Sequence, residues 1–194
     1  MTKREEFIAV YQENIKRRGA DRLLEWLDSD ASDFFTAPSS TRFHGAYEGG
    51  LVEHSLNVYE CLKDYLSRPR TKDLYGMDYT PETIAVTALL HDICKVGFYA
   101  VDYRNAKNDQ GVWEKVPYYT VRDTLPYGHG EKSVYMIQSF MRLTRDEAFA
   151  PSAITWAFPE TRTKTAWAEH WRCSLWRWRS MWRIWRQRII WKGL

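Results

Sequence analysis

Three of the five histidines in this chain of 194 residues stand in segments with helical patterns, each beside small or acidic residues. His54 belongs to the first segment, and His129 stands between two glycines at the start of the last. Between them, His91 is followed directly by Asp92. Imidazole nitrogens combined with a carboxylate oxygen suit Zn, Mn, Fe or Mg rather than a thiolate site. A lone buried histidine is more often a hydrogen-bonded core residue than a metal ligand. Several histidines and an aspartate in this order instead predict a metal site, around which the helices pack.

The residues around these histidines form three motifs. The first, over residues 43–58, joins His44 to a Gly-Gly pair and then to Glu-His. The second, over 88–97, reads Ala-Leu-Leu-His-Asp-Ile-Cys-Lys-Val-Gly, and the third, over 128–133, reads Gly-His-Gly-Glu-Lys-Ser. Together they resemble the HD-domain metal-dependent phosphohydrolase superfamily, and they are most similar to the HD half of certain bacterial 3′–5′ exoribonucleases. The resemblance covers roughly residues 40–150.

This resemblance implies a set of metal ligands. In the superfamily, a first His, the His-Asp pair and a distant final Asp hold an ion, which makes His54, His91 and Asp92 ligands here. Members with two ions add two further histidines, and His129 matches the first of them. The implied cofactor is a divalent cation, and Mn, Mg, Fe, Zn and Ni are not distinguished. Such an ion polarises a phosphoryl oxygen and lowers the pKa of a bound water, which Asp92 would help to orient.

Two other motif residues are candidates for contact with substrate. Lys95 matches a Lys that contacts substrate phosphate in the superfamily. The alternative is a solvated cation near the C-terminus of the helix that carries Asp92, where the helix dipole favours it. Cys94 stands where Gly is usual, which puts the backbone fit of Lys95 in question. His44 either contacts substrate or braces the loop before the helix of His54. The sequence thus assigns catalysis to Asp92 and Lys95, and substrate binding to Lys95 and His44.

The apolar periodicity predicts a mostly α-helical fold. Helices are expected over residues 3–18, 21–28, 50–67, 81–96, 129–142 and from 145 onward. Thr80 is expected to cap the fourth helix, with Pro81 at its first position. Residues 98–127 contain two β-prone stretches around an Asn- and Gly-containing turn, which predicts a small β-hairpin inserted between helices. The expected architecture is an HD-type helical domain over 1–150, with its core motifs at 43–145.

Composition agrees with one domain and gives no sign of export. A chain of 23.1 kDa with 44% hydrophobic residues can bury one good core. No apolar stretch follows the charged N-terminal residues, and no run of about 18 apolar residues occurs, so neither a signal peptide nor a spanning helix is expected. Three cysteines without metal-type spacing indicate free thiols in the cytoplasm.

Residues 151–194 form an atypical Trp/Arg-rich tail. They hold eight of the ten tryptophans, and nine Lys and Arg against two Asp and Glu. Residues 1–150 hold 19 basic and 23 acidic residues, so the body is mildly acidic and only the tail is basic. Trp-Arg pairs occur five times in the tail, which average protein composition does not produce.

One explanation of the tail is a reading-frame error. Trp has a single codon, TGG. When the codons of a Trp-Arg pair are read in the frame that begins one base earlier, the codon that spans the two residues is GCG or GAG, which encodes Ala or Glu. The neighbouring frame of residues 151–192 is compatible with a sequence that contains Arg-x-His-x-Gly and Ala-Asp-Met-Glu-Ala. These look like the second distal His and the final Asp that the superfamily has and this chain lacks. The competing explanation is a genuine basic amphipathic helix, with Trp171, Trp178, Trp182 and Trp185 on one stripe, that binds an anionic membrane or nucleic acid.

The expected function is metal-dependent hydrolysis of a phosphoester, in a phosphorylated small molecule such as a nucleotide or at a nucleic-acid end. Loss of the distal His and the final Asp would impair this activity. The alternative, from another class, is a non-catalytic HD-like module that binds nucleotide or nucleic acid, with the tail adding membrane or RNA affinity. The sequence does not determine the oligomeric state.

Overall fold

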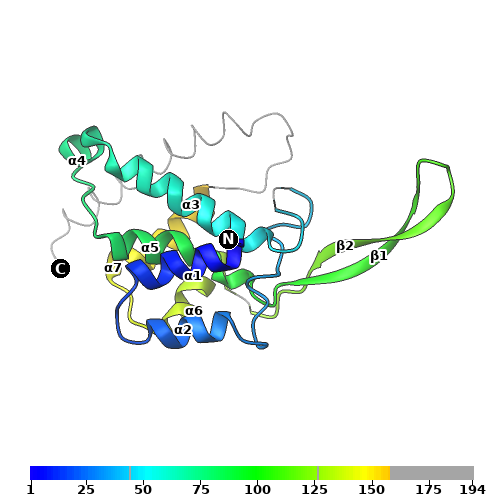
Figure 1. Ribbon diagram of the computed structural model, residues 1–194, viewed down its shortest axis with the longest axis horizontal. Coiled ribbons are helices and arrows are strands. Elements are labelled where there is room, and N and C mark those ends of the chain that lie inside the picture. Colours follow the sequence, from blue (N-terminus) through cyan, green and yellow to red (C-terminus); the bar gives the residue numbers. More distant parts are fainter. Residues whose placement is uncertain (44, 126, 158–194) are drawn as a thin grey trace.

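The computed structural model describes residues 1–157 except 44 and 126 (Figure 1). The elements, in chain order, are α1 (Lys3–Asn14), α2 (Ala20–Leu27), α3 (Gly50–Ser67), α4 (Pro69–Tyr75), α5 (Pro81–Leu89), the 3-10 turn η1 (Ile93–Lys95), β1 (Tyr99–Lys107), β2 (Trp113–Val121), α6 (His129–Gln138) and α7 (Arg145–Ala157). The prediction of a mostly helical fold with a small β-hairpin is confirmed. The expectations for His44, for Cys173 and for the tail beyond residue 157 fall outside the described residues.

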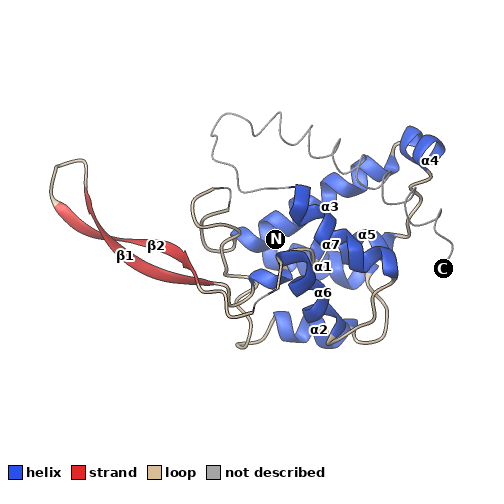
Figure 2. Ribbon diagram, turned by 180° about the vertical axis from the view of Figure 1, so that it is seen from behind, coloured by secondary structure: helices blue, strands red, loops and turns tan. Residues whose placement is uncertain are grey.

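The helices pack into one body, and the hairpin projects from it (Figures 1 and 2). α3 lies against α5, α1 packs on both, and α6 packs on α7. Five helices contribute fully buried side chains to the core, among them Phe7, Leu23, Leu51, Leu89 and Ile137. Burial of each such side chain stabilises a fold by about 1.5–3 kcal/mol. The core therefore holds α3 and α5 in a fixed relation. Three of the predicted ligands, His54, His91 and Asp92, lie on or next to these two helices, and His129 begins α6.

A close approach of two backbone segments fixes the start of α3. Gly49 is the N-cap and has φ 78°, a left-handed conformation that favours glycine. A Cβ on Gly50 would lie 2.1 Å from the carbonyl oxygen of Gly45, so only glycine fits there. The Gly-Gly pair thus forms a tight turn, which places the helix of His54 against the preceding loop.

α1 ends earlier than its periodicity predicts. The helix stops at Asn14 rather than at residue 18. The N–H groups of Lys16 and Arg17 instead donate to Glu82 Oε1, at 2.8 and 3.0 Å. A side chain of α5 thus binds backbone groups that would otherwise have continued α1. Two smaller differences are that α4 lies in a segment where no element was predicted, and that α6 ends at Gln138 rather than at residue 142.

The predicted hairpin lies within residues 98–127. β1 pairs antiparallel with β2, from Tyr99 opposite Val121 to Lys107 opposite Trp113. Within the described chain the sheet has these two strands only, so both of its outer edges lack a strand partner. A two-stranded sheet has little core of its own and is at best marginally stable in isolation.

α7 runs from Arg145 through the division at residue 150 to Ala157, so the first described residues of the tail continue a helix of the body. The division of the chain at 150 stays a prediction. Among residues 1–157, no helix is both long and apolar enough to cross a membrane.

Candidate metal centre

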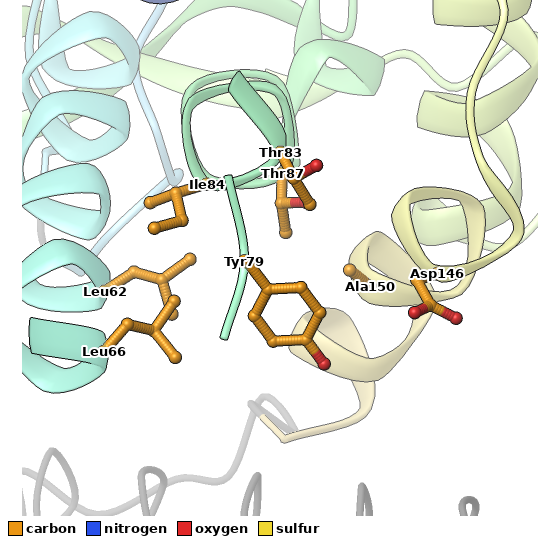
Figure 3. A pocket seen from close by; sticks show the side chains of 8 residues that line it. All are labelled: Leu62, Leu66, Tyr79, Thr83, Ile84, Thr87, Asp146 and Ala150. Atoms are coloured by element: carbon orange, nitrogen blue, oxygen red, sulfur yellow. The ribbon is translucent and has the colours of Figure 1, made fainter. Parts of the chain in front are cut away.

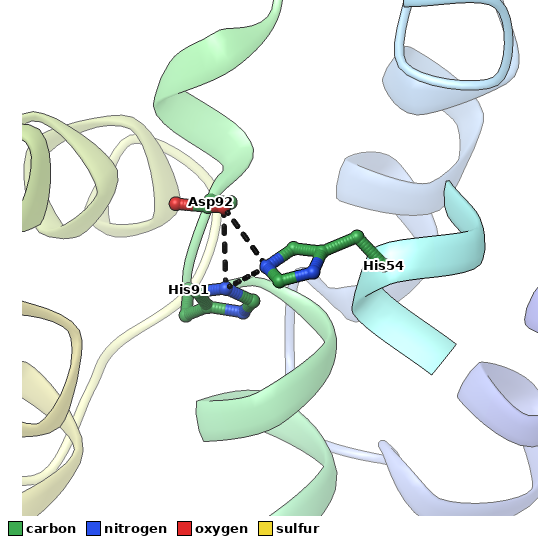
Figure 4. Close-up of side chains that lie close together, drawn as sticks. All are labelled: His54, His91 and Asp92. Atoms are coloured by element: carbon green, nitrogen blue, oxygen red, sulfur yellow. Dashed lines mark hydrogen bonds and ion pairs between the residues drawn. The ribbon is translucent and has the colours of Figure 1, made fainter. Parts of the chain in front are cut away.

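Three of the predicted ligands meet in one place (Figure 4). His54 comes from the second turn of α3, and His91 and Asp92 follow the end of α5. His54 Nε2 lies 3.2 Å from His91 Nε2 and 3.4 Å from Asp92 Oδ2. His91 Nε2 lies 3.3 Å from the same oxygen, and the ligand atoms all lie within 4.8 Å of one another. Two imidazole nitrogens and a carboxylate oxygen at this spacing can hold a divalent cation.

The His91-Asp92 pair stands beyond the end of α5, so the prediction of a helix through residue 96 was wrong. Leu90 (φ −111°, ψ 4°) and Asp92 (φ −107°, ψ 18°) leave the helical region. Both adopt the sparsely populated bridge conformation in which many active-site residues are found. The chain then continues as η1, which carries Lys95. This turn directs the paired side chains toward His54 (Figure 4).

A buried serine on α6 shapes this turn, and sequence reasoning missed it. Ser133 Oγ donates to the carbonyl oxygen of His91 at 2.6 Å and accepts from the N–H of Cys94 at 3.3 Å. These contacts satisfy backbone groups that α5 leaves without helical partners when it ends. The sequence did offer a signal for this role, because Ser133 stands four residues after His129 in the third motif. A serine hydroxyl can donate one hydrogen bond and accept another at the same time.

The hydrogen bonding of His91 leaves its other nitrogen available for a ligand. Nδ1 lies 2.8 Å from the carbonyl oxygen of Ala88, which can only accept, so the proton of the neutral ring is on Nδ1. The Nε2 lone pair then points toward His54 and Asp92. Metal-binding histidines usually donate their second N–H to a carbonyl or a carboxylate in this way. The donor set therefore fits a cation.

The local charges favour the protonation states that bind a cation. Burial alone would raise the pKa of Asp92, but Lys95 and the two histidines outweigh it and hold that pKa well below its ordinary value. Burial is the main influence on His54 and lowers its pKa, so this ring is neutral at neutral pH. An ionised carboxylate and a neutral imidazole are the forms that bind metal.

Lys95 is not the solvated cation at a helix end that was one of its two expected roles. Its Nζ donates to Asp92 Oδ2 and to the carbonyl oxygen of Ser39, both at 2.8 Å, and its side chain is 16% exposed. Burial would lower the pKa of Lys95, but the charge of Asp92 outweighs it, so the pKa is raised and the group is charged. Its contact with a substrate phosphate stays a prediction. Ser39 was missed because a backbone acceptor leaves no mark on the sequence.

His129 lies beside this group and not in it. Its Nδ1 is 3.5 Å from Cys94 Sγ, and its ring meets the Phe98 ring edge-on, with 5.2 Å between centroids. Among the described residues, the set of close ligand atoms does not include His129. Its role as a ligand of a second ion stays a prediction. Cys94 fits the η1 turn where Gly was expected, and burial raises the pKa of its thiol to about 12, which keeps it protonated.

A separate apolar pocket lies between α3, α5 and α7 (Figure 3). It is lined by Leu62, Leu66, Tyr79, Thr83, Ile84, Thr87, Asp146 and Ala150. None of the predicted ligands lines this pocket. The pocket is therefore distinct from the metal group.

Comparison with known proteins decides the family. Residues 51–170, more than half of the chain, match the HD domain. The chain belongs to the HD domain family. The dihydroneopterin 2′,3′-cyclic phosphate phosphodiesterase of Methanocaldococcus jannaschii is 39% identical over 62 residues, which are 30% of this chain and 23% of that protein. The aligned part is therefore less than a quarter of this relative. No solved structure gave a significant match.

The HD domain match includes the residues that make up the site. His54, His91, Asp92 and Ser133 all lie within residues 51–170.

Proposed function

We propose that this HD domain hydrolyses a phosphodiester of a nucleotide or of a nucleic-acid end, with a divalent cation held by His54, His91 and Asp92. The observation that carries the proposal is the convergence of two imidazole nitrogens and one carboxylate oxygen within 4.8 Å. The bond between His91 Nδ1 and the Ala88 carbonyl supports it, because it leaves Nε2 without a proton. The relative, which acts on a cyclic phosphate, supports a phosphodiester as the bond to be cleaved.

In the proposed reaction, different residues of the chain hold the cation, contact the substrate phosphate and orient the ligands. A bound cation would supply Lewis-acid polarisation of a phosphoryl oxygen and acidify a water. Asp92 stays ionised because Lys95 lies 2.8 Å from Oδ2. With Asp92 engaged by a cation, the Lys95 ammonium would be the group on this chain that contacts a phosphate oxygen of the substrate. The Ser133 and Ala88 contacts keep His91 in the ligand orientation while substrate enters.

The activity is tested with bis(4-nitrophenyl) phosphate and a 2′,3′-cyclic nucleotide in the presence of Mn²⁺ or Mg²⁺. The unmodified chain should turn over at least one of these substrates. Asp92→Asn should lower the turnover rate at least about 100-fold, since loss of a residue that only hydrogen-bonds to a metal ligand already costs about 10–100-fold. Asp109→Asn, in the hairpin loop, is the matched control and should keep full activity. Retained metal and nucleotide binding without any turnover would instead indicate the non-catalytic module.

The proposal extends to His129 as a ligand of a second ion. Metal stoichiometry separates this role from a structural one. Two bound ions in the unmodified chain and one in His129→Ala would support the second ion. One ion in both proteins would exclude it and leave His129 as a partner of Cys94 and Phe98.

We also propose that residues 151–194 are read out of frame and that the domain belongs near the HD half of bacterial 3′–5′ exoribonucleases. The recurring Trp-Arg pairs support the first part, because their shifted codons give Ala or Glu in register with an apolar helix. Within residues 1–157, one carboxylate and two imidazoles converge, which agrees with a ligand set that lacks its final Asp. Sequencing of the coding DNA past codon 150 tests the reading frame directly.

A further inference from the structure

The β1–β2 hairpin projects from the helical body, and the metal group does not explain it (Figures 1 and 2). In an antiparallel pair, successive side chains alternate between two faces, and residues opposite each other share a face. The register from Tyr99–Val121 to Lys107–Trp113 therefore sorts the side chains of the hairpin into two sets.

One set forms what we term the aromatic–lysine face, with the rings of Tyr103, Trp113 and Tyr119 and the cations of Lys107 and Lys115. Tyr103 is 63% exposed and Trp113 is 65% exposed. Both lysines are also exposed. No acidic residue of either strand lies on this face. Lys107 Nζ lies over the Trp113 ring, 5.3 Å from its centroid. The face therefore combines exposed rings with positive charge that no acidic residue of the strands balances.

The opposite face is arranged differently. It carries both acidic residues of the strands, Asp102 and Glu114, together with Arg104 and Tyr118. Arg104 lies over the Tyr118 ring at 5.7 Å, and the Tyr118 hydroxyl donates to Asp102 at 3.4 Å. This face therefore carries two acidic residues and one basic residue, whereas the aromatic–lysine face carries basic residues and no acidic ones. In the described part of the chain, the two lysines of the aromatic–lysine face form no ion pair.

The base of the aromatic–lysine face adjoins the metal group. Tyr99 begins β1 and shares this face by register. Its hydroxyl donates to the Ser39 carbonyl oxygen at 3.0 Å, and Lys95 Nζ donates to the same oxygen at 2.8 Å. From Tyr99 to Lys107 the strand extends about 26 Å at ~3.3 Å per residue. An extended polymer lying along the face would thus have one end beside Asp92.

We infer that the aromatic–lysine face binds single-stranded nucleic acid and leads its end to the metal group. The inference rests on the proposed function and names its substrate class. Exposed rings stack on unpaired bases of any sequence, and lysines without acidic neighbours neutralise phosphates. A duplex hides its base faces from such rings. A second copy of the chain, paired through the open strand edges, would gain nothing from the separation of charge between the two faces.

The test is fluorescence anisotropy of a labelled single strand of about 12 nucleotides, as RNA and as DNA, with EDTA present to prevent hydrolysis. The full chain should bind this strand more tightly than the corresponding duplex or a mononucleotide. Tyr103→Ala and Trp113→Ala should each weaken binding by about 5- to 100-fold. The double variant Lys107→Ala/Lys115→Ala should reduce the slope of log K against log salt concentration by about 1.4.

Matched controls change the same kinds of residue on the other face. Tyr118→Ala and Arg104→Ala should leave binding unchanged. Every variant keeps residues 158–194, so any contribution of that basic segment is common to all of them. Equal binding by variants of both faces, or equal affinity for single strand and duplex, would overturn the inference. A dimer that only the aromatic–lysine variants dissociate, with oligonucleotide binding unaffected, would overturn it in favour of a second copy.

Failure of this inference can be told apart from failure of the proposed function. A full chain that hydrolyses bis(4-nitrophenyl) phosphate with Mn²⁺ but does not bind the strand would refute the inference alone. A full chain that binds the strand through the aromatic–lysine face but hydrolyses no phosphoester would refute the proposed activity alone.

Discussion

His54 and His91 place their Nε2 atoms 3.2 Å apart. The proton of His91 is engaged on the other side of the ring by the Ala88 carbonyl, so the space between the two rings holds either a proton of His54 or a cation. Asp92 Oδ2 lies within 3.4 Å of both nitrogens. A cation that enters this space therefore meets a negative charge and displaces at most one proton from the imidazoles.

Replacement of the serine that holds the turn should weaken metal binding. Ser133→Ala leaves the His91 carbonyl and the Cys94 N–H without their partner, which should cost about 1–3 kcal/mol of folding free energy. Because the turn orients two ligands, Mn²⁺ affinity should fall by about 10- to 100-fold. Ser139→Ala, whose exposed hydroxyl donates to Tyr135, is the matched control. Calorimetric titration measures both, and unchanged Mn²⁺ affinity in Ser133→Ala would contradict the assigned role.

Lys95 competes with a cation for Asp92, so its removal should have opposite effects on binding and turnover. Lys95→Gln should raise Mn²⁺ affinity by up to about tenfold, or 1.4 kcal/mol, because a repelling charge is lost. Turnover of a phosphodiester should fall, since the cation for the substrate phosphate is also lost. Lys63→Gln, on the exposed side of α3, should change neither. Lower metal affinity in Lys95→Gln would show that the lysine supports the site instead of competing.

The ion pair between Arg17 and Glu147 should give a defined acid dependence of stability. Two bonds of 2.6 and 2.8 Å join them, and Glu147 is 1% exposed. Burial would raise the pKa of Glu147, but the Arg17 contacts and the Thr144 N–H outweigh it and hold the pKa below its ordinary value near 4.5. Since Arg17 is partly solvated, Glu147→Gln should cost about 2 kcal/mol at pH 7, less than a fully buried pair.

A depressed folded pKa means that the contribution of Glu147 is complete above pH 4.5 and is lost as pH falls through the folded value. The stability difference between the unmodified chain and Glu147→Gln should therefore be constant from pH 7 to about 5 and should shrink below about 4.5. Urea unfolding at each pH measures it, with Glu60→Gln as an exposed control. A difference that grows on acidification would contradict the assigned ion pair.

Restoration of the neighbouring frame after codon 150 should improve the site. If the tail is out of frame, as proposed, the shifted sequence would supply an Asp and a His like those that the superfamily uses as ligands. Mn²⁺ affinity and phosphodiester turnover should each rise by more than about tenfold. Residues that only hydrogen-bond to metal ligands already contribute about 10–100-fold, so a restored ligand should contribute at least the lower of these values. Asp92→Asn in the restored protein should abolish the gain. Equal activity of the two frames would show that the tail and its missing ligands do not matter, and would contradict the frameshift account of function.

The helices that the sequence predicts best are those whose limits are set locally. α3 spans Gly50–Ser67, as its periodicity and the Gly-Gly pair predict, and α5 starts at Pro81 with Thr80 as its cap. Both signals lie within a few residues of the helix start. The ends of α1 and α5 could not be predicted in this way, because Glu82 and Ser133 bind the backbone there from distant parts of the sequence.

In the metal group, too, the residues that could be predicted are those that lie in a short local motif. His54, His91 and Asp92 could be predicted because each lies in a motif of a few residues, and the structure brings them together. The hydrogen bonds that fix them use the carbonyl groups of Ala88 and Ser39, and a backbone carbonyl is present at every position of a sequence.

The most direct test of the central claim is the equilibrium binding of Mn²⁺ to the full chain, followed by electron paramagnetic resonance of the free ion. The account predicts that the chain binds Mn²⁺ and that His54→Ala, His91→Ala and Asp92→Asn each weaken binding by at least about 100-fold, while folding is retained by circular dichroism. Asp109→Asn should bind as the unmodified chain does. Equal Mn²⁺ affinity in all five proteins would contradict a metal centre at His54, His91 and Asp92.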